Sequence, residues 1–503
     1  MKDLQSSFEE LQRKLVPLWR SIGSINDDEQ TIVVVPSISG ELNDSLGGSG
    51  QVYEERFLFL LFLLRQPSAR LIYVTGKQID PDIVDYYLDL LPGVISTHAR
   101  KRLHLVSPLD GNQIPLSKKL LQRPRLIEHI KQLIPDPDRA HLIPYNTTEL
   151  ERDLAVALGI PMYGADPKHF HLGSKSGCRR LFEELGVKHP LGAENLHSLD
   201  DLVGAIDGLR AQRPTITEVL VKSNEGAGGM GNALIDLRGL PEPGPASAEA
   251  VTDRIMKMRF DDPSTPISAY LEDVQREGGI VEERIKGDDF RSPSVQLRVT
   301  PLGDLEILST HDQLLGGPSG QTYLGCVFPA DPGYAVAITD EARKVGERLA
   351  KEGVIGRFAL DFVTVKKPDG SWDSYAIEIN LRKGGTTHPF LTLQFLTNGD
   401  YDAATATFTT ASGRSKCFVA SDHVESHAYK GLSPEDLFDI AVKSGLHFDH
   451  TRQTGIVYHM ISSISTEGRT GITAVGDSPE DARMIYQRAL SAIDEAAEGA
   501  LIP

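Results

Sequence analysis

Residues 356–382 read GRFALDFVTVKKPDGSWDSYAIEINLR, which is two β patterns joined by a turn that contains Pro, Asp and Gly. In the second pattern, isoleucine and leucine alternate with Glu378, Asn380 and Arg382. Successive side chains of a strand point to opposite faces, so one face is apolar and the other carries an acid, an amide and a guanidinium. A hairpin of the two patterns therefore places Asp361 opposite this polar row.

The polar row has the chemistry of a magnesium site. Two carboxylates and an amide carbonyl are hard oxygen ligands, and Mg²⁺ usually completes its shell with substrate phosphates and water. Arg382 is then positioned to contact a phosphoryl oxygen. The same alternation also fits an amphipathic hairpin with a solvated charged face, so the rest of the chain must decide between the two interpretations.

Composition limits the classes of protein. The chain has 503 residues, so we expect roughly two to four domains. A hydrophobic fraction of 40% and a charged fraction of 24% are ordinary for a soluble globular protein. The net charge of −18 argues against binding to nucleic acid or to an anionic membrane surface. Any bound nucleotide must therefore be held by local cations and metal.

Cysteine usage and hydropathy indicate a cytoplasmic protein. Cys178, Cys326 and Cys417 are far apart, and the sequence has no CxxC motif that would indicate zinc or a disulfide framework. The start of the chain is an amphipathic helix pattern without the apolar core of a signal peptide. The apolar run FLFLLFLL at 57–64 is shorter than the roughly 20 residues of a membrane span, so we expect a buried helix.

The first unit, residues 1–146, has the pattern of a small parallel sheet. Short apolar strands (TIVVV, ARLIYVTG, LHLV, HLIPYN) alternate with helical patterns near 50–65, 80–91 and 116–134. This order predicts βαβ units. The glycine-rich SLGGSGQ at 45–51 follows the first strand, and it fits either a ligand-binding loop or a plain turn.

Three further units follow. Residues 147–266 contain helices and then the strands EVLVKS and NALIDL, and residues 267–412 are mainly β with one long helix. Residues 413–503 contain Ser-Pro-Glu-Asp at 433–436 and at 478–481. Serine as N-cap, proline at the first helical position and acids in the first turn explain both tetrapeptides as helix starts. The helices expected in the second and third units are 148–158, 174–185, 199–212 and 339–352.

A lysine and a glycine-rich turn follow one another at the end of EVLVKS. Lys222 precedes SNEGAGGMG, in which Gly226, Gly228 and Gly231 spell the dinucleotide motif GxGxxG. That motif requires a helix after the glycines, whereas NALIDL predicts a strand. A glycine-rich turn between two strands is instead typical of a flap whose backbone N–H groups close over phosphates.

Other candidate nucleotide contacts lie on either side of the flap. Lys175 begins a helical segment, where a single lysine is more often solvated. GIVEERIKGDDF at 279–290 predicts a strand and a linker, which suit backbone recognition of adenine, and Asp289 is placed for ribose hydroxyls. Arg298 lies in a later strand, where it fits either a substrate carboxylate or an ion pair with a surface acid.

These pieces, in this order and spacing, resemble the ATP-grasp superfamily over residues 170–392. The resemblance implies an α/β and α+β fold. It comprises a pre-ATP-grasp α/β domain (1–146), an ATP-grasp N-terminal subdomain with the flap (147–266), a C-terminal subdomain with the hinge and metal site (267–412) and a small C-terminal α+β domain (413–503). The whole layout, with RKGGTTHP, resembles the bacterial peptide ligase group typified by the pheganomycin ligase.

The resemblance also implies a role for each matching residue. The ATP phosphates would be contacted by Lys175, Lys222, Glu225, Gly226, Gly228 and Gly229. The adenine hinge and the ribose acid would be Glu282, Glu283, Ile285 and Asp289. The metal ligands would be Asp361, Glu378 and Asn380, with Asp361 where relatives often have the longer glutamate. The catalytic residues would be Arg382, which precedes a His-Pro pair as in the carboxylase-like branch, and Arg298.

The implied activity is an ATP-dependent ligation of a carboxylate to an amine through an acyl phosphate. The implied cofactors are ATP and two Mg²⁺ ions, for which Mn²⁺ can substitute. The partners would be small-molecule or peptide substrates, with no nucleic acid and no membrane, and a homo-oligomer is compatible with the sequence. An ATP-grasp kinase would have the same site, and a nucleotide-binding regulatory protein without turnover is a third interpretation, which Arg382 argues against.

Overall fold

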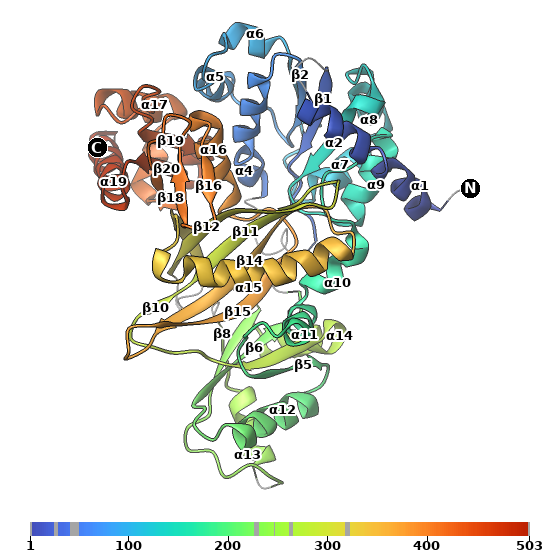
Figure 1. Ribbon diagram of the computed structural model, residues 1–503, viewed down its shortest axis with the longest axis vertical. Helices are drawn as coiled ribbons and strands as arrows, with labels where there is room; N and C mark the ends of the chain where they lie inside the picture. The colour runs from blue at the N-terminus through green and yellow to red at the C-terminus, as the bar shows by residue number, and fades with distance from the viewer. Residues whose placement is uncertain are drawn as a thin grey trace.

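The computed structural model describes residues 3–24, 29–40, 50–225, 231–245, 247–260, 265–316 and 322–500. Within these ranges the strands form sheets of four, five and nine strands and a two-stranded ribbon. Figure 1 shows the nine-stranded sheet across the middle of the molecule, with the four-stranded unit above it and the five-stranded unit below it.

The N-terminal unit is the predicted parallel sheet. Its strands, in the order β3-β2-β1-β4, are all parallel to their neighbours, and the expected helices lie between them. The strands are β1 (Gln30–Val35), β2 (Ala69–Val74), β3 (Leu103–Val106) and β4 (Ala140–Pro144). The helices are α1 (Leu4–Gln12), α2 (Leu15–Ser24), α4 (Gly50–Glu55), α5 (Pro81–Asp89), α6 (Ser96–Arg100), α7 (Leu116–Leu121), α8 (Pro124–Gln132) and the short η2 (Pro137–Arg139). The FLFLLFLL run forms the buried 3₁₀ helix η1 (Leu58–Arg65).

The five-stranded unit is antiparallel and has the order β5-β9-β6-β7-β8. Its strands are β5 (Gly192–Leu196), β6 (Glu218–Ser223), β7 (Asn232–Asp236), β8 (Arg259–Phe260) and β9 (Gly279–Glu283). The helices of this region are α9 (Glu149–Leu158), η3 (Pro167–His169), α10 (Phe170–Gly173), α11 (Lys175–Leu185), α12 (Leu199–Gln212), α13 (Ala248–Ile255) and α14 (Ile267–Glu277). Because α14 packs in the core of this unit and β9 pairs with β5 and β6, the unit extends beyond residue 266, where the sequence analysis placed its end.

The nine-stranded sheet has the order β10-β14-β11-β12-β13-β18-β20-β19, and β15 pairs with β14. Its strands are β10 (Phe290–Arg291), β11 (Pro293–Val299), β12 (Leu305–Gly316), β13 (Thr322–Phe328), β14 (Gly356–Lys366), β15 (Trp372–Asn380), β18 (Cys417–Glu425), β19 (Gly455–His459) and β20 (Arg469–Gly476). The last three come from the predicted C-terminal domain, so residues 413–503 extend the central sheet rather than form a separate one.

Helices cover this sheet and end the chain. They are α15 (Pro332–Lys351), α16 (Thr387–Thr397), η4 (His427–Gly431), α17 (Pro434–Lys443), α18 (Ser463–Glu467) and α19 (Pro479–Ala500), and β16 (Asp400–Asp402) and β17 (Thr407–Thr409) form the ribbon. The helix α15 begins before the predicted residue 339, because Asp331 caps it by accepting a 2.8 Å hydrogen bond from Gly333 N and Pro332 stands at its first position. Ser433 forms the predicted capping box at α17, and Asp481 N donates to Ser478 Oγ at α19.

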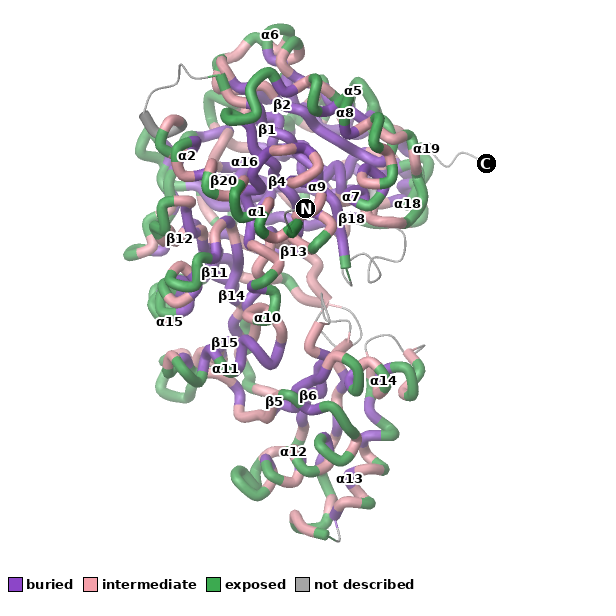
Figure 2. Tube along the Cα trace, turned by 90° about the vertical axis from the view of Figure 1, so that its right-hand side faces the viewer, coloured by how far each residue is buried: buried purple, intermediate pink, exposed green. Residues whose placement is uncertain are grey.

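The apolar cores explain which way the hairpin faces. Leu360, Phe362 and Ile379 pack in one core with α11 and α15, so their neighbours along β14 and β15 point to the other side of the sheet. A second core joins η1 and α5 to α16, β18 and α19, so the N-terminal and C-terminal regions share apolar contacts. Figure 2 shows this buried interior beneath exposed outer helices. Among the described residues, no helix has the length and apolar character of a membrane span.

Candidate active site

The strands β14 and β15 form the predicted hairpin and bring the three candidate metal ligands together. Asp361 lies opposite Glu378, and Ala359 lies opposite Asn380. The Asn380 Nδ2 donates to Asp361 Oδ2 at 3.0 Å, which leaves the amide oxygen of Asn380 for another partner. A β-bulge between Asp361 and Phe362 interrupts the register at this point. Bulges of this kind re-aim side chains next to functional sites.

The electrostatics of the pair fit a bound cation. Burial, together with the negative charge of Glu378, raises the pKa of Asp361 to about 6. Burial acts in the same direction on Glu378, but the charge and hydrogen bond of Lys175 outweigh it and hold the pKa of Glu378 below its ordinary value. Two half-buried carboxylates that face each other repel, and a divalent cation between them would remove that repulsion. Asp361, Glu378 and Asn380 are therefore a suitable set of oxygen ligands for Mg²⁺.

Lys175 lies at this pair rather than in solvent. Its Nζ is 2.6 Å from Glu378 Oε1, and the residue is 6% exposed. The start of α11 fixes its position, because Ser174 is the N-cap and Asn224 accepts a hydrogen bond from Ser176 N at 3.0 Å. The backbone N–H of Lys175 also donates to Asn224 O at 3.1 Å. The turn after β6 therefore positions the lysine beside the metal site.

Lys222 is buried in the five-stranded unit. Its Nζ is 2.5 Å from Glu282 Oε1, and Glu282 is 2% exposed. Arg179 contacts the other carboxylate oxygen of Glu282 at 3.4 Å. Arg179 is one helical turn after Lys175, so a single face of α11 supplies both cations. Glu282 thus orients Lys222 in a region where a nucleotide phosphate would meet two further positive charges.

The glycine-rich turn has the context of a flap. The strands β6 and β7 are antiparallel neighbours, and Lys222 lies opposite Asn232. A strand after the glycines excludes the dinucleotide-binding fold suggested by GxGxxG. Glu225 lies in the described part of the turn, whereas Gly226, Gly228 and Gly229 lie outside the described residues. Most of the glycine-rich SLGGSGQ segment of the first unit also lies outside them.

The predicted hinge residues are partly engaged in internal contacts. Glu283 forms an ion pair with Arg213 and accepts a 3.0 Å hydrogen bond from Leu191 N. Glu283 N donates to Leu191 O at 2.8 Å. Because Glu282 and Glu283 both form ion pairs, their side chains hold the linker in place and do not project from it. Ile285 follows β9 in this linker and is half-buried, so recognition of adenine there stays a prediction.

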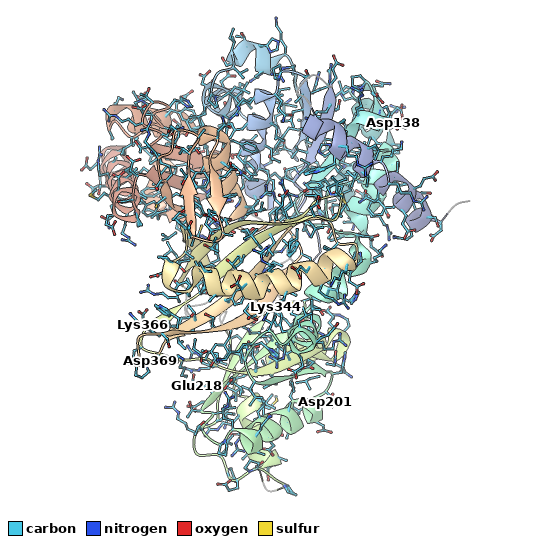
Figure 3. The ribbon with its side chains drawn as sticks, viewed as in Figure 1. Asp138, Asp201, Glu218, Lys344, Lys366 and Asp369 are labelled. Carbon is cyan, nitrogen blue, oxygen red and sulfur yellow. The ribbon has the colours of Figure 1, made fainter. Side chains whose placement is uncertain are left out.

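Asp289 lies near the far end of the metal hairpin. Its backbone oxygen accepts a 3.0 Å hydrogen bond from Lys366 N, and its carboxylate forms a 2.8 Å ion pair with Arg291. Lys366 is five residues from Asp361 along β14, which corresponds to about 17 Å. Figure 3 labels Lys366 at this end of the hairpin, above Glu218 of the five-stranded unit. The role of Asp289 in binding ribose stays a prediction.

The two candidate arginines have different surroundings. Arg382 follows β15 on the polar face, and its charge lowers the pKa of both Asp361 and Glu378 against the effect of burial. Its Nη1 donates to Lys383 O at 3.2 Å. Arg298, in contrast, forms an ion pair with Glu306, and its guanidinium lies 5.4 Å from the ring centre of Trp19. The structure thus has the ion pair that the sequence analysis considered for Arg298.

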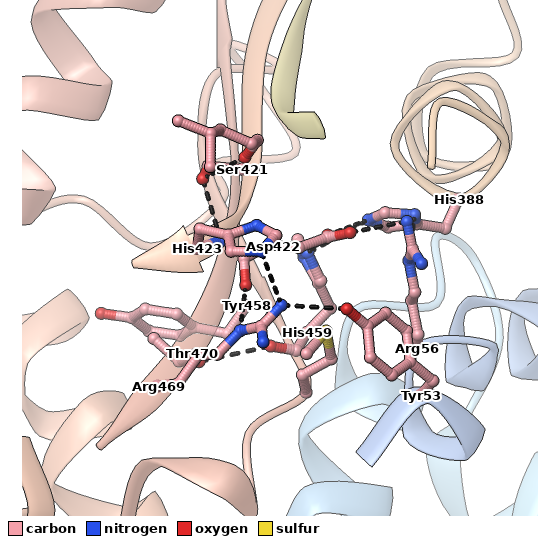
Figure 4. Close-up of polar contacts among 12 residues, drawn as sticks. Tyr53, Arg56, His388, Ser421, Asp422, His423, Tyr458, His459, Arg469 and Thr470 are labelled. Carbon is pink, nitrogen blue, oxygen red and sulfur yellow. Dashed lines mark hydrogen bonds and ion pairs between the residues drawn. The ribbon is translucent and has the colours of Figure 1, made fainter. Parts of the chain in front are cut away.

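A buried network that the sequence analysis missed adjoins the segment after Arg382 (Figure 4). Asp422 Oδ2 is 2.6 Å from Arg56 Nη2, and Asp422 Oδ1 is 2.7 Å from His459 Nε2. His388, in the first turn of α16, lies 3.3 Å from Asp422 Oδ1 through its Nε2. Gly385 has no room for a side chain, because an added Cβ would lie 2.5 Å from the ring of Tyr323. The network therefore fixes α16 against the N-terminal and C-terminal regions.

Three side chains of this network, the two histidines and the aspartate, have the spacing of metal ligands. Atoms of His388, Asp422 and His459 lie within 4.8 Å of one another. However, Arg56 Nε donates a 3.1 Å hydrogen bond to His388 Nδ1. An arginine cannot accept a proton there, so His388 Nδ1 is the acceptor and the ring proton lies on Nε2, which prevents Nε2 from binding a metal. The network is complete without an ion.

Only some of the contacts around the candidate site could be predicted from the sequence. The four-residue spacing of Lys175 and Arg179 on a helix indicates a shared face. The side chain of Asn224 also donates to Glu277 O at 2.8 Å, and no local pattern predicts that contact. The residues of the Asp422 network are more than 300 positions apart at their extremes, so only tertiary structure could reveal it.

Comparison with known proteins agrees with this geometry. Residues 168–253 and 245–404 match a family model described as IQCH-like, ATP-grasp, and residues 436–489 match the PGM1 C-terminal domain. A biotin carboxylase domain of 2-oxoglutarate carboxylase from Hydrogenobacter thermophilus, solved with MgADP, ADP and bicarbonate, superposes with a TM-score of 0.53. It is 12% identical and covers 92% of this chain and 89% of its own. These matches show that the chain has the ATP-grasp fold.

Within this class, the chain is similar to a peptide-ligase type of protein. It is 29% identical over 448 residues to the L-propargylglycine--L-glutamate ligase of Streptantibioticus cattleyicolor, across 87% of this chain and 88% of that protein. It is also 26% identical over 434 residues to IQ motif-containing protein H of Danio rerio. That match covers 76% of this chain, which spans only 40% of the fish protein.

Proposed function

We propose that this protein is an ATP-dependent carboxylate–amine ligase that forms a peptide-type amide and releases ADP and phosphate. The observation that carries the proposal is the convergence of Asp361, Glu378 and Lys175 on one polar face of an ATP-grasp sheet. The similarity to an L-propargylglycine--L-glutamate ligase over most of both chains supports ligation as the outcome.

The residues suit the two steps of this reaction. A carboxylate oxygen of the acid attacks the γ-phosphorus, the bond to ADP breaks, and an acyl phosphate forms. The amine nitrogen then attacks the acyl carbon, phosphate leaves, and the amine loses a proton. Lys175, Lys222 and Arg382 supply positive charge to the transferring phosphoryl group, and such charge is most of what phosphoryl transfer needs. Magnesium bound at Asp361, Glu378 and Asn380 would neutralise charge on the phosphates.

The flap has a specific task in this scheme. An acyl phosphate hydrolyses in water, so the site must close before the intermediate forms. Glu225 and the glycines at 226, 228 and 229 are proposed to close over the phosphates, and Glu282, Glu283, Ile285 and Asp289 to hold the nucleoside. Two Mg²⁺ ions, replaceable by Mn²⁺, would complete the site. The buried thiols of the three cysteines suit a reducing compartment such as the cytoplasm.

Hydroxylamine trapping tests ligation directly. Incubation with ATP, a library of carboxylic acids and hydroxylamine, without any amine substrate, is expected to give a hydroxamate, because the strong nucleophile intercepts the acyl phosphate. The hydroxamate is measured by its coloured iron complex and by mass spectrometry. Reactions without ATP and reactions of the Glu378→Gln variant are the controls, and neither should give product.

The kinase interpretation predicts a different outcome of the same experiment. A kinase that phosphorylates an alcohol gives a phosphate ester, which resists hydroxylamine under mild conditions. ADP release that depends on the added compound and leaves a stable phosphorylated product, with no hydroxamate, would replace the ligase proposal with a kinase on the same fold.

A further inference from the structure

An excess of positive charge lies beyond the metal site, along the same polar face of the nine-stranded sheet. Arg357 is four residues before Asp361 on β14, so both side chains point to one face, about 13 Å apart along the strand. Arg298 of β11 lies directly opposite Arg357 and also directly opposite Glu306 of β12. Lys383 follows Arg382 at the end of the hairpin.

Among the described residues, only one of these three cations has a carboxylate partner. Glu306 is taken by Arg298, with which it forms an ion pair. Among the described residues, Arg357 has neither an ion pair nor a hydrogen bond from its side chain, and Lys383 has no acidic partner. Lys383 Nζ donates only to a backbone oxygen, that of Pro144 at the end of β4, at 2.7 Å. Lys383 is buried and Arg357 is half-buried, and a positive charge without a counter-charge is costly to bury, so both groups favour an anionic partner.

The pKa values of Arg357 and Lys383 reflect this excess of positive charge. Burial, reinforced by the charge of Arg298, lowers the pKa of Arg357 to about 10. Burial, reinforced by the charge of Arg357, lowers the pKa of Lys383 to about 7. Tyr163 and Glu306 act against burial at Arg357. An anion bound between Arg357 and Lys383 would stabilise the charged form of both.

The N-terminal unit contributes a buried nitrogen atom that has no hydrogen-bond partner among the described residues. His141 of β4 is 8% exposed, its Nδ1 has no hydrogen-bond partner among the described residues, and the charge of Lys383 acts on it. Gly356, with φ of +98°, lies so close to Gly164 that an added Cβ would be 3.0 Å from its Cα. Gly164 thus lies directly against the sheet beside Arg357, and the hydrogen bond of Lys383 to Pro144 O joins the N-terminal unit to the same region. The cations therefore lie at a junction of domains, where small-molecule sites are common.

We propose that Arg357 and Lys383, next to Arg382, form a subsite for a carboxylate of the substrate that does not react. The inference rests on the proposed ligase function and names its substrate class, an amino acid or peptide with a carboxylate besides the reacting group. A guanidinium binds a carboxylate through two parallel hydrogen bonds, and Lys383 supplies a third donor. Arg382, which precedes Lys383 and lies on the polar face with the candidate metal ligands, would then face the reacting end of the same molecule.

The carboxylate can belong to the acid or to the amine, and two assays separate these sources. Hydroxamate formation involves no amine substrate, so it reports on the acid alone. In this assay L-glutamate is compared with L-glutamine, and glutarate is compared with its monoamide. Amide formation is compared for an amino acid and its primary amide as nucleophile. The pair that differs by about tenfold or more in kcat/KM identifies the substrate that carries the bound carboxylate.

The variants test the residues themselves. Arg357→Gln is expected to raise KM for the carboxylate-bearing substrate about tenfold or more and to remove the preference over its amide, with KM for ATP unchanged. Arg357→Lys should recover part of the loss because it keeps one charge. Lys344→Gln, on the exposed face of α15 (Figure 3), is the matched control and should leave every constant unchanged. Thermal unfolding verifies that each variant is folded.

Binding without turnover separates this inference from the proposed function. Titration calorimetry with glutarate should detect binding to the wild type and a loss of about tenfold or more in Arg357→Gln. If glutarate binds in this way but no acid yields a hydroxamate, the ligase proposal fails and the anion subsite stands. If hydroxamates form but neither the removal of the second carboxylate nor Arg357→Gln changes KM, the subsite is overturned and the ligase proposal stands.

Discussion

Asp361 and Glu378 carry most of the functional argument at the scale of single residues. They face each other across two strands and are both half-buried, yet among the described residues only Glu378 of the pair contacts a lysine. The difference explains why burial raises the pKa of Asp361 to about 6 whereas the pKa of Glu378 is lowered. A cation at the pair is expected to keep both carboxylates ionised at neutral pH.

The first prediction at this scale concerns Glu378→Gln. The substitution preserves size but removes a charge that the metal needs, so ADP release should fall on the order of 100-fold or more. Affinity for ATP in calorimetry should fall much less, because the nucleoside contacts lie elsewhere. Glu435→Gln, an exposed acid in the first turn of α17, is the control and should be fully active. Wild-type turnover in Glu378→Gln would refute the metal assignment.

At the scale of elements, the turn after β6 joins three pieces of the proposed phosphate site. Asn224 accepts hydrogen bonds from Ser176 N and Oγ at 3.0 and 2.7 Å and donates to Glu277 O at 2.8 Å. It thereby connects the start of α11, the base of the flap and the end of α14. Because Lys175 lies at the start of α11, the turn decides where its ammonium group points.

The corresponding prediction is that Asn224→Ala weakens both the fold and ATP binding. The substitution leaves buried donors at Ser176 without their acceptor, which should lower the free energy of unfolding by about 1–3 kcal/mol in urea titrations. KM for ATP should rise as well, because Lys175 is no longer fixed. Asn112→Ala, at an exposed loop position, should change neither quantity. A loss of stability with unchanged KM for ATP would show that the turn does not position Lys175.

At the scale of the whole molecule, the Asp422 network fastens three regions together. Arg56 comes from the N-terminal region, His388 from α16, and Asp422 and His459 from β18 and β19. Burial lowers the pKa of His388 to about 3, and it also lowers the pKa of His459. The folded protein therefore favours the neutral form of both rings.

This arrangement predicts that acid destabilises the protein. The folded pKa of His388 lies below the unfolded value of about 6.5, so between these values the unfolded state binds more protons and stability falls as the pH decreases. A neutral buried histidine contributes up to about 1.4 kcal/mol per pH unit in this window. The low pKa of Asp422 acts in the same direction at lower pH, because its stabilising charge is lost only on acidification.

Urea titrations between pH 7 and pH 5 measure this dependence. His388→Gln should reduce the slope of unfolding free energy against pH by up to about 1.4 kcal/mol per unit, whatever its effect on stability at pH 7. His427→Gln, at an exposed position, should leave the slope unchanged. Equal slopes in the wild type and His388→Gln would mean that His388 is not buried as a neutral ring.

The sequence by itself determined the elements and the face on which the metal ligands lie. Helix starts depend on capping residues and proline within one turn, and strand faces depend on alternation at a period of two, so both follow from neighbouring residues. The strand after the glycine-rich turn could also be predicted from neighbouring residues. Because the dinucleotide motif requires a helix there, the strand favoured the flap interpretation. The hairpin that pairs Asp361 with Glu378 needed only these patterns and a short turn.

Only the tertiary structure decided which distant charges meet. It paired Arg298 with Glu306 and left Arg357 without an acidic partner among the described residues. It also joined residues 413–500 to the central sheet and placed 267–283 in the flap-bearing unit. The Asp422 network and the contact of Lys383 with Pro144 likewise connect separate domains. Such contacts depend on how sheets and helices pack, and packing is a property of the assembled core that no local periodicity encodes.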